Sequence, residues 1–119
     1  MKVLELAFTC YAVTDMPRAR AFYEGILGLT PGMISDTENG KWTEYEIGPH
    51  TLSIGSAPGF NPSAEGCIAA LEMDDFDAAI AGLKAQGVPF RMEPFPTPVC
   101  RMAMITDPDG NTICIHKRH

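Results

Sequence analysis

Hydrophobic and polar residues follow several periods along the chain, and each change of period predicts a new element. Residues 2–13 form a strand pattern. Residues 14–28 instead carry an apolar stripe at helical spacing, formed by Ala19, Phe22, Ile26 and Leu27. Three shorter strand patterns follow at 29–35, 41–47 and 50–56, separated by the turn signals ENG and GPH. The first half of the chain is therefore predicted to be βαβββ.

The predicted helix has both a start and a stop signal. Asp15 or Thr14 can accept hydrogen bonds from the N–H groups of the first turn, and Pro17 suits that turn. Gly28 suits the conformation that ends a helix.

The same order of elements then begins again. A passage rich in Gly, Pro and Ser at about 58–66 is typical of a linker. An offset of 60 residues sets Asp75 on Asp15 at the start of a second helix pattern. We predict one domain over 1–119, with modules at about 2–57 and 67–117. The second module has a strand at 67–73, a helix at 74–87 and strands at 89–95, 100–106 and 111–117.

Two tandem βαβββ modules predict the fold class, which is α+β. Each helix has one apolar stripe and can cover one face of its own sheet. The opposite face is then left to enclose something else. We expect a curved, cupped mixed sheet with the helices on its outer face.

Composition and charge exclude several classes of protein. The formal charge of −6 disfavours binding to nucleic acid. We find no secretory leader and no apolar run of the roughly 18 residues that a membrane span needs, so we expect a cytoplasmic protein without a membrane partner. The four cysteines contain no CxxC pair, which favours reduced thiols over a zinc knuckle or a disulfide framework.

Cys114 and His116 are the first candidates for chemistry. They lie two residues apart in a strand pattern, so their side chains share a face with Cβ atoms roughly 7 Å apart. A nucleophilic thiol needs a closer base or cation, so Cys114 is better explained as a small buried side chain. His116 can act as a general base or can lie in solvent at the end of the strand.

Three segments resemble the vicinal oxygen chelate superfamily: YAVTDMPRARAFYEGILGLTP, LEMDDFDAAIAGLKAQGVPF and ITDPDGNTICIHK. This superfamily includes glyoxalase I, bleomycin-resistance proteins, fosfomycin-resistance enzymes and extradiol dioxygenases. The resemblance covers residues 3 to 117. It implies two βαβββ modules, a homodimer and a pocket for a small molecule, but it does not select a reaction.

Metal-using members of this superfamily hold an ion with a His early in each module and a Glu in the last strand of each module. The corresponding positions here are Phe8, Ser53, Ile68 and Cys114. Phe and Ile cannot coordinate an ion, and Ser with Cys is a poor donor pair for hard ions. We therefore predict no metal and no other cofactor. A divalent metal, or a soft site built from Cys114, Cys10 and His116, is the alternative.

The four positions just named also predict a pocket, one that binds a small molecule without chelating an ion. Around them, the two-residue period of strands adds Ala70 and Thr112 to the lining, with Glu72 and His116 near the rim. Trp42 and Tyr45 can form a stacking wall, or Trp42 can make an edge or dimer contact. The predicted pocket residues are Phe8, Trp42, Ser53, Ile68, Ala70, Thr112, Cys114 and His116.

Two functions follow from this pocket. The first is a metal-independent, homodimeric protein that binds an apolar or aromatic small molecule, similar to the bleomycin-resistance proteins. The alternative is a glyoxalase-like lyase or isomerase, or another enzyme of the superfamily, with displaced catalytic groups. The candidate catalytic residues are then His116, Glu72 and Cys114.

Overall fold

The computed structural model describes residues 1–2 and 4–119. The chain divides into two compact units, Met1–Pro62 and Ser63–His119, and each is described by itself. The division falls inside the predicted linker. Among the described residues, no helix is long and apolar enough to cross a membrane.

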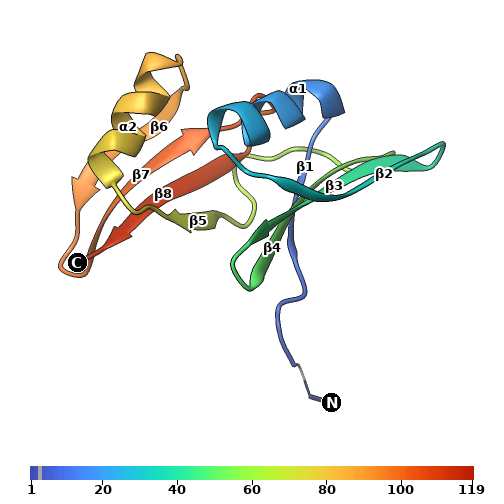
Figure 1. Cartoon of the computed structure of the whole chain (residues 1–119), viewed down its shortest axis with the longest axis horizontal. Coiled ribbons are helices and arrows are strands. Elements are labelled where there is room, and N and C mark those ends of the chain that lie inside the picture. The colour runs from blue at the N-terminus through green and yellow to red at the C-terminus, as the bar shows by residue number, and fades with distance from the viewer. Residues whose placement is uncertain (3) are drawn as a thin grey trace. The chain divides into compact units, whose positions relative to one another are not determined.

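The first unit contains a four-stranded mixed sheet and one helical segment (Figure 1). Its strand order is β1-β4-β3-β2; β1 runs parallel to β4, and the other neighbours are antiparallel. In chain order the elements are β1 (Thr9–Ala12), α1 (Met16–Arg20), η1 (Ala21–Ile26), β2 (Pro31–Thr37), β3 (Gly40–Ile47) and β4 (His50–Ser56).

The second unit repeats this arrangement. Its strand order is β5-β8-β7-β6, with β5 parallel to β8 and α2 packed on one face of the sheet (Figure 1). Both units are thus βαβββ modules, which confirms the predicted fold class. The elements are β5 (Ala69–Glu72), α2 (Phe76–Ala85), β6 (Phe90–Pro96), β7 (Cys100–Thr106) and β8 (Thr112–Arg118).

Equivalent carboxylates start the two helices. The Asp15 side chain accepts a hydrogen bond from the backbone N–H of Arg18 at 3.0 Å. Asp75 accepts the same bond from Ala78, also at 3.0 Å. Each bond satisfies an N–H group that has no partner within the helix, which explains why both helices begin where the sequence predicts.

The first helical segment differs from the single α-helix expected over 14–28. It is α-helical only to Arg20, and a π-helical turn follows, in which the N–H of Leu27 donates to the carbonyl of Phe22 at 3.0 Å. The wider turn accompanies the burial of two consecutive aromatic rings, Phe22 and Tyr23. A regular α-helical repeat separates consecutive side chains by about 100°, so it presents only one of them fully to the core.

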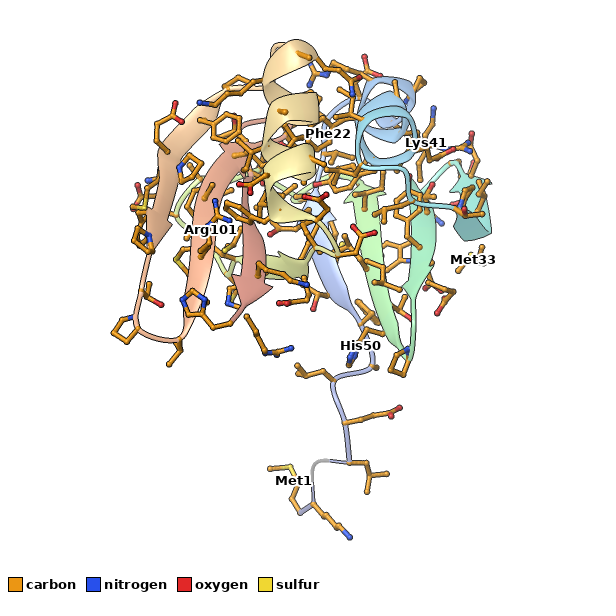
Figure 2. The ribbon with its side chains drawn as sticks, turned by 60° about the vertical axis from the view of Figure 1, so that its left-hand side comes forward. Met1, Phe22, Met33, Lys41, His50 and Arg101 are labelled. Atoms are coloured by element: carbon orange, nitrogen blue, oxygen red, sulfur yellow. The ribbon has the colours of Figure 1, made fainter. Side chains whose placement is uncertain are left out.

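Each unit buries an apolar core between its sheet and its helix. In the first unit, Tyr23 stacks on Tyr45 of β3, with ring centroids 6.0 Å apart. Tyr45 is fully buried on the helix side, so the prediction that it forms a stacking wall with Trp42 is wrong, because side chains three positions apart on a strand lie on opposite faces. In the second unit, Ile113 and Ile115 of β8 are fully buried, and Arg101 of β7 reaches α2 to pair with Asp77 at 2.7 Å (Figure 2). Because strand residues alternate between faces, these contacts identify the helix-facing side of each sheet. The candidate site residues lie on the other side.

The DPDGN turn before β8 is held by side chains. The backbone N–H of Asn111 donates to Asp107 Oδ1 at 2.8 Å, and the Asn111 amide donates to Asp107 Oδ2 at 2.9 Å. The Asn111 side-chain oxygen accepts from the N–H of Ser63 at 3.0 Å, which ties the end of the linker to this turn. The turn therefore fixes where β8 begins.

Candidate functional site

The first unit carries an aromatic cluster, formed by Phe8, Trp42 and Phe60, on the face of its sheet that lies away from the helix. Gly55 of β4 forms the floor beneath two of these rings. A Cβ atom at Gly55 would lie 2.9 Å from Trp42 Cε3 and 3.1 Å from Phe60 Cε2. Phe8 packs edge-on against Trp42, with centroids 5.4 Å apart and planes at 85°. Phe8 and Phe60 remain 50% and 44% exposed, so the cluster presents ring surface outward.

A carboxylate fixes the orientation of the tryptophan. The indole Nε1–H of Trp42 donates to Oε2 of Glu44 at 2.9 Å. Both residues lie on β3, two positions apart, on the same face of the sheet. The cluster can therefore stack an aromatic group, with a negative charge beside it.

Polar groups under the cluster are buried and locally satisfied. The Ser53 hydroxyl, which is fully buried, donates to the backbone carbonyl of Thr9 at 3.3 Å. Cys10 pairs with Ser53 in the ladder of β1 and β4. Burial raises the pKa of the Cys10 thiol, and the hydrogen bond with Ser53 opposes that shift only in part. Neither residue is prepared for nucleophilic attack.

The second unit presents sulfur-containing and apolar side chains on the corresponding face. The ladders place Ala70 opposite Cys114, Cys114 opposite Met104 and Met104 opposite Met92, so one row of side chains crosses all four strands. Ile68, immediately before β5, is 45% exposed. A cavity of about 350 Å³ lies on this face, lined by Ala64, Glu65, Gly66, Ile68, Arg91, Met92, Met104 and Thr112.

An arginine closes one side of this cavity. The Arg91 guanidinium donates to Thr112 Oγ1 at 2.8 Å and to the backbone carbonyl of Ala64. It also pairs with the exposed Glu65 at 3.1 Å. The Thr112 hydroxyl donates to the same carbonyl at 2.9 Å. Arg91 thus links β6 and β8 to the end of the linker.

A histidine and a carboxylate meet on the adjacent row. Nδ1 of His116 lies 2.6 Å from Oε1 of Glu72, and the two residues are partners in the ladder of β5 and β8. The backbone N–H of Arg118 donates to Oε2 of Glu72 at 2.9 Å. This N–H bond and then the contact with His116 lower the pKa of Glu72. The carboxylate orients the imidazole, and Nε2 is left for another partner.

Cys114 is a buried thiol. It is 2% exposed, and burial raises the pKa of its Sγ above the ordinary value. The thiol therefore stays protonated near neutrality, which argues against Cys114 as a nucleophile. His116 lies two residues along the strand and is paired with Glu72 instead.

A larger cavity of about 410 Å³ lies on the helix side of the first unit. Its charges are largely paired, since Arg20 holds Glu24 through Nε at 2.6 Å and Tyr45 donates to the same carboxylate at 2.9 Å. Burial and the neighbouring Glu24 raise the pKa of Tyr45 well above its ordinary value. The cavity is lined by Met16, Pro17, Arg20, Ala21, Glu24, Gly25, Ile34, Ser35, Asp36, Lys41 and Thr43.

Comparison with known protein families identifies these two modules. The profile of the Glyoxalase/Bleomycin resistance protein/Dioxygenase superfamily matches residues 5–115. The chain belongs to this superfamily. The match spans both units, which confirms the resemblance found in the sequence.

Solved structures of this superfamily have different functions. TnmS3, an antibiotic binding protein from Streptomyces sp. CB03234, is 27% identical, with a TM-score of 0.80 over 100% of this chain and 99% of that chain. The glyoxalase I of Leishmania major is 21% identical, with a TM-score of 0.79 over 97% and 87%. The fosfomycin resistance protein FosX of Mesorhizobium loti is 23% identical, with a TM-score of 0.74 over 97% and 92%. No curated protein matches the chain.

The residues at the superfamily's ligand positions do not fit a hard divalent ion. In the first unit they are a phenylalanine ring and a buried serine, Phe8 and Ser53; in the second they are Ile68 and the protonated thiol of Cys114. None provides an imidazole or a carboxylate, which such ions prefer. Within the described parts of the chain, no three His, Cys, Asp or Glu residues gather as a metal site.

The structure groups the predicted site residues by unit. Phe8, Trp42 and Ser53 lie on the outward face of the first sheet, and Ile68, Ala70, Thr112, Cys114 and His116 lie on the corresponding face of the second. Of the three catalytic candidates, Glu72 and His116 are in contact, whereas Cys114 lies on the neighbouring row. Their roles in binding or catalysis remain predictions.

Sequence reasoning missed several contributors to these faces. Met102 and Met104 lie at alternate positions of β7, and this spacing in CRMAMIT could have placed both on the face of Cys114. Gly55 in the middle of a strand is a recognised signal of close approach, which the rings above it provide. Phe60 and Glu44 have no comparable local signal.

Proposed function

We propose that this protein binds an apolar or aromatic small molecule without a divalent metal, in the manner of the antibiotic-binding branch of its superfamily. The observation that carries the proposal is the replacement of all four ion-ligand positions by Phe8, Ser53, Ile68 and Cys114. The exposed aromatic cluster over Gly55 supports it, because large uncovered rings are typical of surfaces that bind. The likeness to an antibiotic binding protein at 27% identity is consistent with this activity.

The chain offers its own probe for binding, because Trp42 is its only tryptophan. Metal-free bleomycin, an acridine dye and an anilinonaphthalene sulfonate differ in charge but all contain aromatic groups. We expect at least one to quench Trp42 emission with saturation. Phe8→Ala should weaken that binding at least about tenfold, because it removes the edge-on partner of Trp42. Thr97→Ala should leave it unchanged, and Ile68→Asp should weaken the binding of any probe that the second unit holds.

Metal independence has a separate test. Thermal melts with Mn, Ni, Zn and Fe(II) ions should leave Tm unchanged, and the purified protein should contain no stoichiometric amount of these metals. Stabilisation by several degrees that a chelator reverses would overturn the proposal. The proposal would also be overturned if Phe8→Ala and Ile68→Asp both bound the quenching probe with unchanged affinity.

We also propose that the protein acts as a homodimer, as its superfamily membership implies. Large apolar side chains are exposed in both units, including Leu6, Phe8 and Ile34 in the first and Met92 in the second. Sedimentation equilibrium should give twice the chain mass of 12.9 kDa. A monomer at micromolar concentration would contradict this part of the proposal.

A glyoxalase-like reaction is the second candidate, and one observation favours it. Glu72 orients His116 at 2.6 Å, as a carboxylate does when it positions a general base. The test is conversion of the hemithioacetal of methylglyoxal and glutathione by protein that is free of divalent metal. Turnover that His116→Gln abolishes while the variant stays folded would favour the enzyme, and no turnover would remove this candidate.

A further inference from the structure

The outward face of the second sheet contains four soft donor groups in a square arrangement. Strand β7 presents Met102 and Met104, and β8 presents Cys114 and His116. The ladder pairs Met102 with His116 and Met104 with Cys114. Directly opposed residues have Cβ atoms about 4.5–5.5 Å apart, and residues two apart on one strand lie roughly 7 Å apart. Long, flexible methionine side chains can span these separations.

The odd-numbered residues of β7 and β8 confirm which face of the sheet carries the four donors. Arg101 and Ala103, at odd positions of β7, lie on the helix side: Arg101 pairs with Asp77 of α2, and Ala103 is fully buried. Ile113 and Ile115 of β8 are also fully buried. The even positions, which carry the four donors, therefore all lie on the outward face.

The donor set selects a class of ion. Two thioethers, one thiol and one imidazole favour soft, monovalent d¹⁰ ions such as Cu(I), whereas Mg, Ca and Mn require oxygen ligands. Structural zinc sites use thiolates and imidazoles, and the described residues contain no group of three such ligands. The square of donors thus differs in chemistry from the ion site of the superfamily.

The histidine is already held as a metal ligand would be. Its Nδ1 lies 2.6 Å from Oε1 of Glu72, whose other oxygen accepts from the N–H of Arg118 at 2.9 Å. A carboxylate on one ring nitrogen of a ligating histidine is the usual outer-shell arrangement, and it fixes the ring so that the other nitrogen can coordinate. An adaptable apolar surface would explain the two methionines. It would not explain why Glu72 holds the imidazole of His116.

The site is also shielded from water. Cys114 is 2% exposed, the His116 side chain is 19% exposed, and Met102 and Met104 are half-buried. We propose that the second unit binds one Cu(I) ion through Met102, Met104, His116 and the thiolate of Cys114, with Glu72 positioning the imidazole. The Cys114 thiol gives up its proton to solvent when the Cu(I)–sulfur bond forms. This binding does not depend on the proposed small-molecule function.

The test is a competition for Cu(I) between the intact protein and bicinchoninate under anaerobic, reducing conditions. We expect the protein to retain one Cu(I) ion per chain. The double variant Met102→Leu, Met104→Leu should weaken binding about 100-fold or more, because it removes two of four ligands while conserving side-chain volume. Glu72→Gln should weaken it roughly 10- to 100-fold through the orientation of His116.

Matched controls separate this site from adventitious binding by thiols. Met33→Leu removes an exposed thioether of the first unit, and Cys67→Ser removes an exposed thiol outside the square. Both should leave the Cu(I) affinity within about twofold, a change of less than half a kcal/mol. Circular dichroism of each variant verifies that it is folded.

A second measurement identifies the nitrogen ligand. Ag(I) is, like Cu(I), a soft monovalent d¹⁰ ion, and it is not oxidised to a paramagnetic divalent ion under these conditions. Titration with Ag(I) should shift the imidazole Nε2 resonance of His116 and leave those of His50 and His119 unchanged. No retained Cu(I), full affinity in the methionine double variant, or no shift at His116 would each overturn the proposal.

Discussion

The close approach at Gly55 allows the sharpest prediction about the aromatic cluster. In Gly55→Ala, the new Cβ would lie 2.9 Å from Trp42 Cε3 and 3.1 Å from Phe60 Cε2. Ordinary carbon–carbon contacts are about 3.5–4.0 Å, so each ring must move by roughly 0.5–1 Å. Trp42 is held by its hydrogen bond to Glu44, which limits that movement.

The expected effect on stability is the difference between two terms. Overpacking costs about 1–3 kcal/mol. The reduced freedom of the unfolded chain offsets about 0.4–1 kcal/mol of that cost. The net loss lies between about 0 and 2.6 kcal/mol, and its mid-range value of about 1.3 kcal/mol corresponds to a decrease in Tm of roughly 5 °C.

Urea unfolding followed by circular dichroism measures this loss, and Trp42 emission reports the ring displacement directly. Gly82→Ala is the matched control, because Gly82 lies inside α2 with no atom within 4 Å of the added Cβ. It should stabilise the protein by about 1 kcal/mol, since alanine favours a helix over glycine. Gly55→Ala with unchanged stability and unchanged Trp42 emission would refute the close packing inferred for the cluster.

Two further predictions concern charged groups. The hydrogen bond from Arg20 lowers the pKa of Glu24 below its ordinary value of 4.5. The ionised Glu24 carboxylate therefore stabilises the folded protein above pH 4.5, and this stabilisation is lost as the pH falls through the lowered pKa. Glu24→Gln should therefore cost at most about 1 kcal/mol at pH 7 and nothing in strong acid, and an equal cost at all pH values would contradict the argument. Arg91→Met should cost about 1–2 kcal/mol in urea unfolding, because it removes a hydrogen bond to the buried Thr112. Lys41→Met, which breaks an exposed ion pair with Asp36, should cost less than about 0.5 kcal/mol, and equal losses would contradict the role assigned to Arg91.

The repeat in the sequence determined most of what could be predicted about the fold. Asp15 and Asp75 are local signals, because a helix cap depends only on residues within one turn. The equivalent ladder places of Ser53 and Cys114 follow from the order of elements, which the two units share. The π-helical turn could not be predicted in this way, because it reflects the packing of two consecutive rings, Phe22 and Tyr23, in one core.

The site was less predictable because its contacts join distant strands. His116 and Glu72 are 44 residues apart, and their contact depends on the register of β5 against β8. The pairing of Met104 with Cys114 likewise needs the register of β7 against β8, since a slip of one residue would move one partner to the other face. The sequence could place each donor on a strand, but only the ladders bring the donors together.

The proposal that neither module holds a hard ion is supported by the surroundings of two positions, Ser53 and Cys114. In the first unit, the one oxygen donor, Ser53, is fully buried and bonded to the carbonyl of Thr9. In the second, Cys114 is surrounded by sulfur and apolar groups, among them Met104 and Ala70. In Cys114→Glu, the new carboxylate would be an unpaired charge among these groups. Burial would raise the pKa of that carboxyl, so it would take up a proton rather than hold an ion. We therefore expect Cys114→Glu alone not to create a hard-ion site, because the surroundings of Cys114 favour soft or apolar ligands.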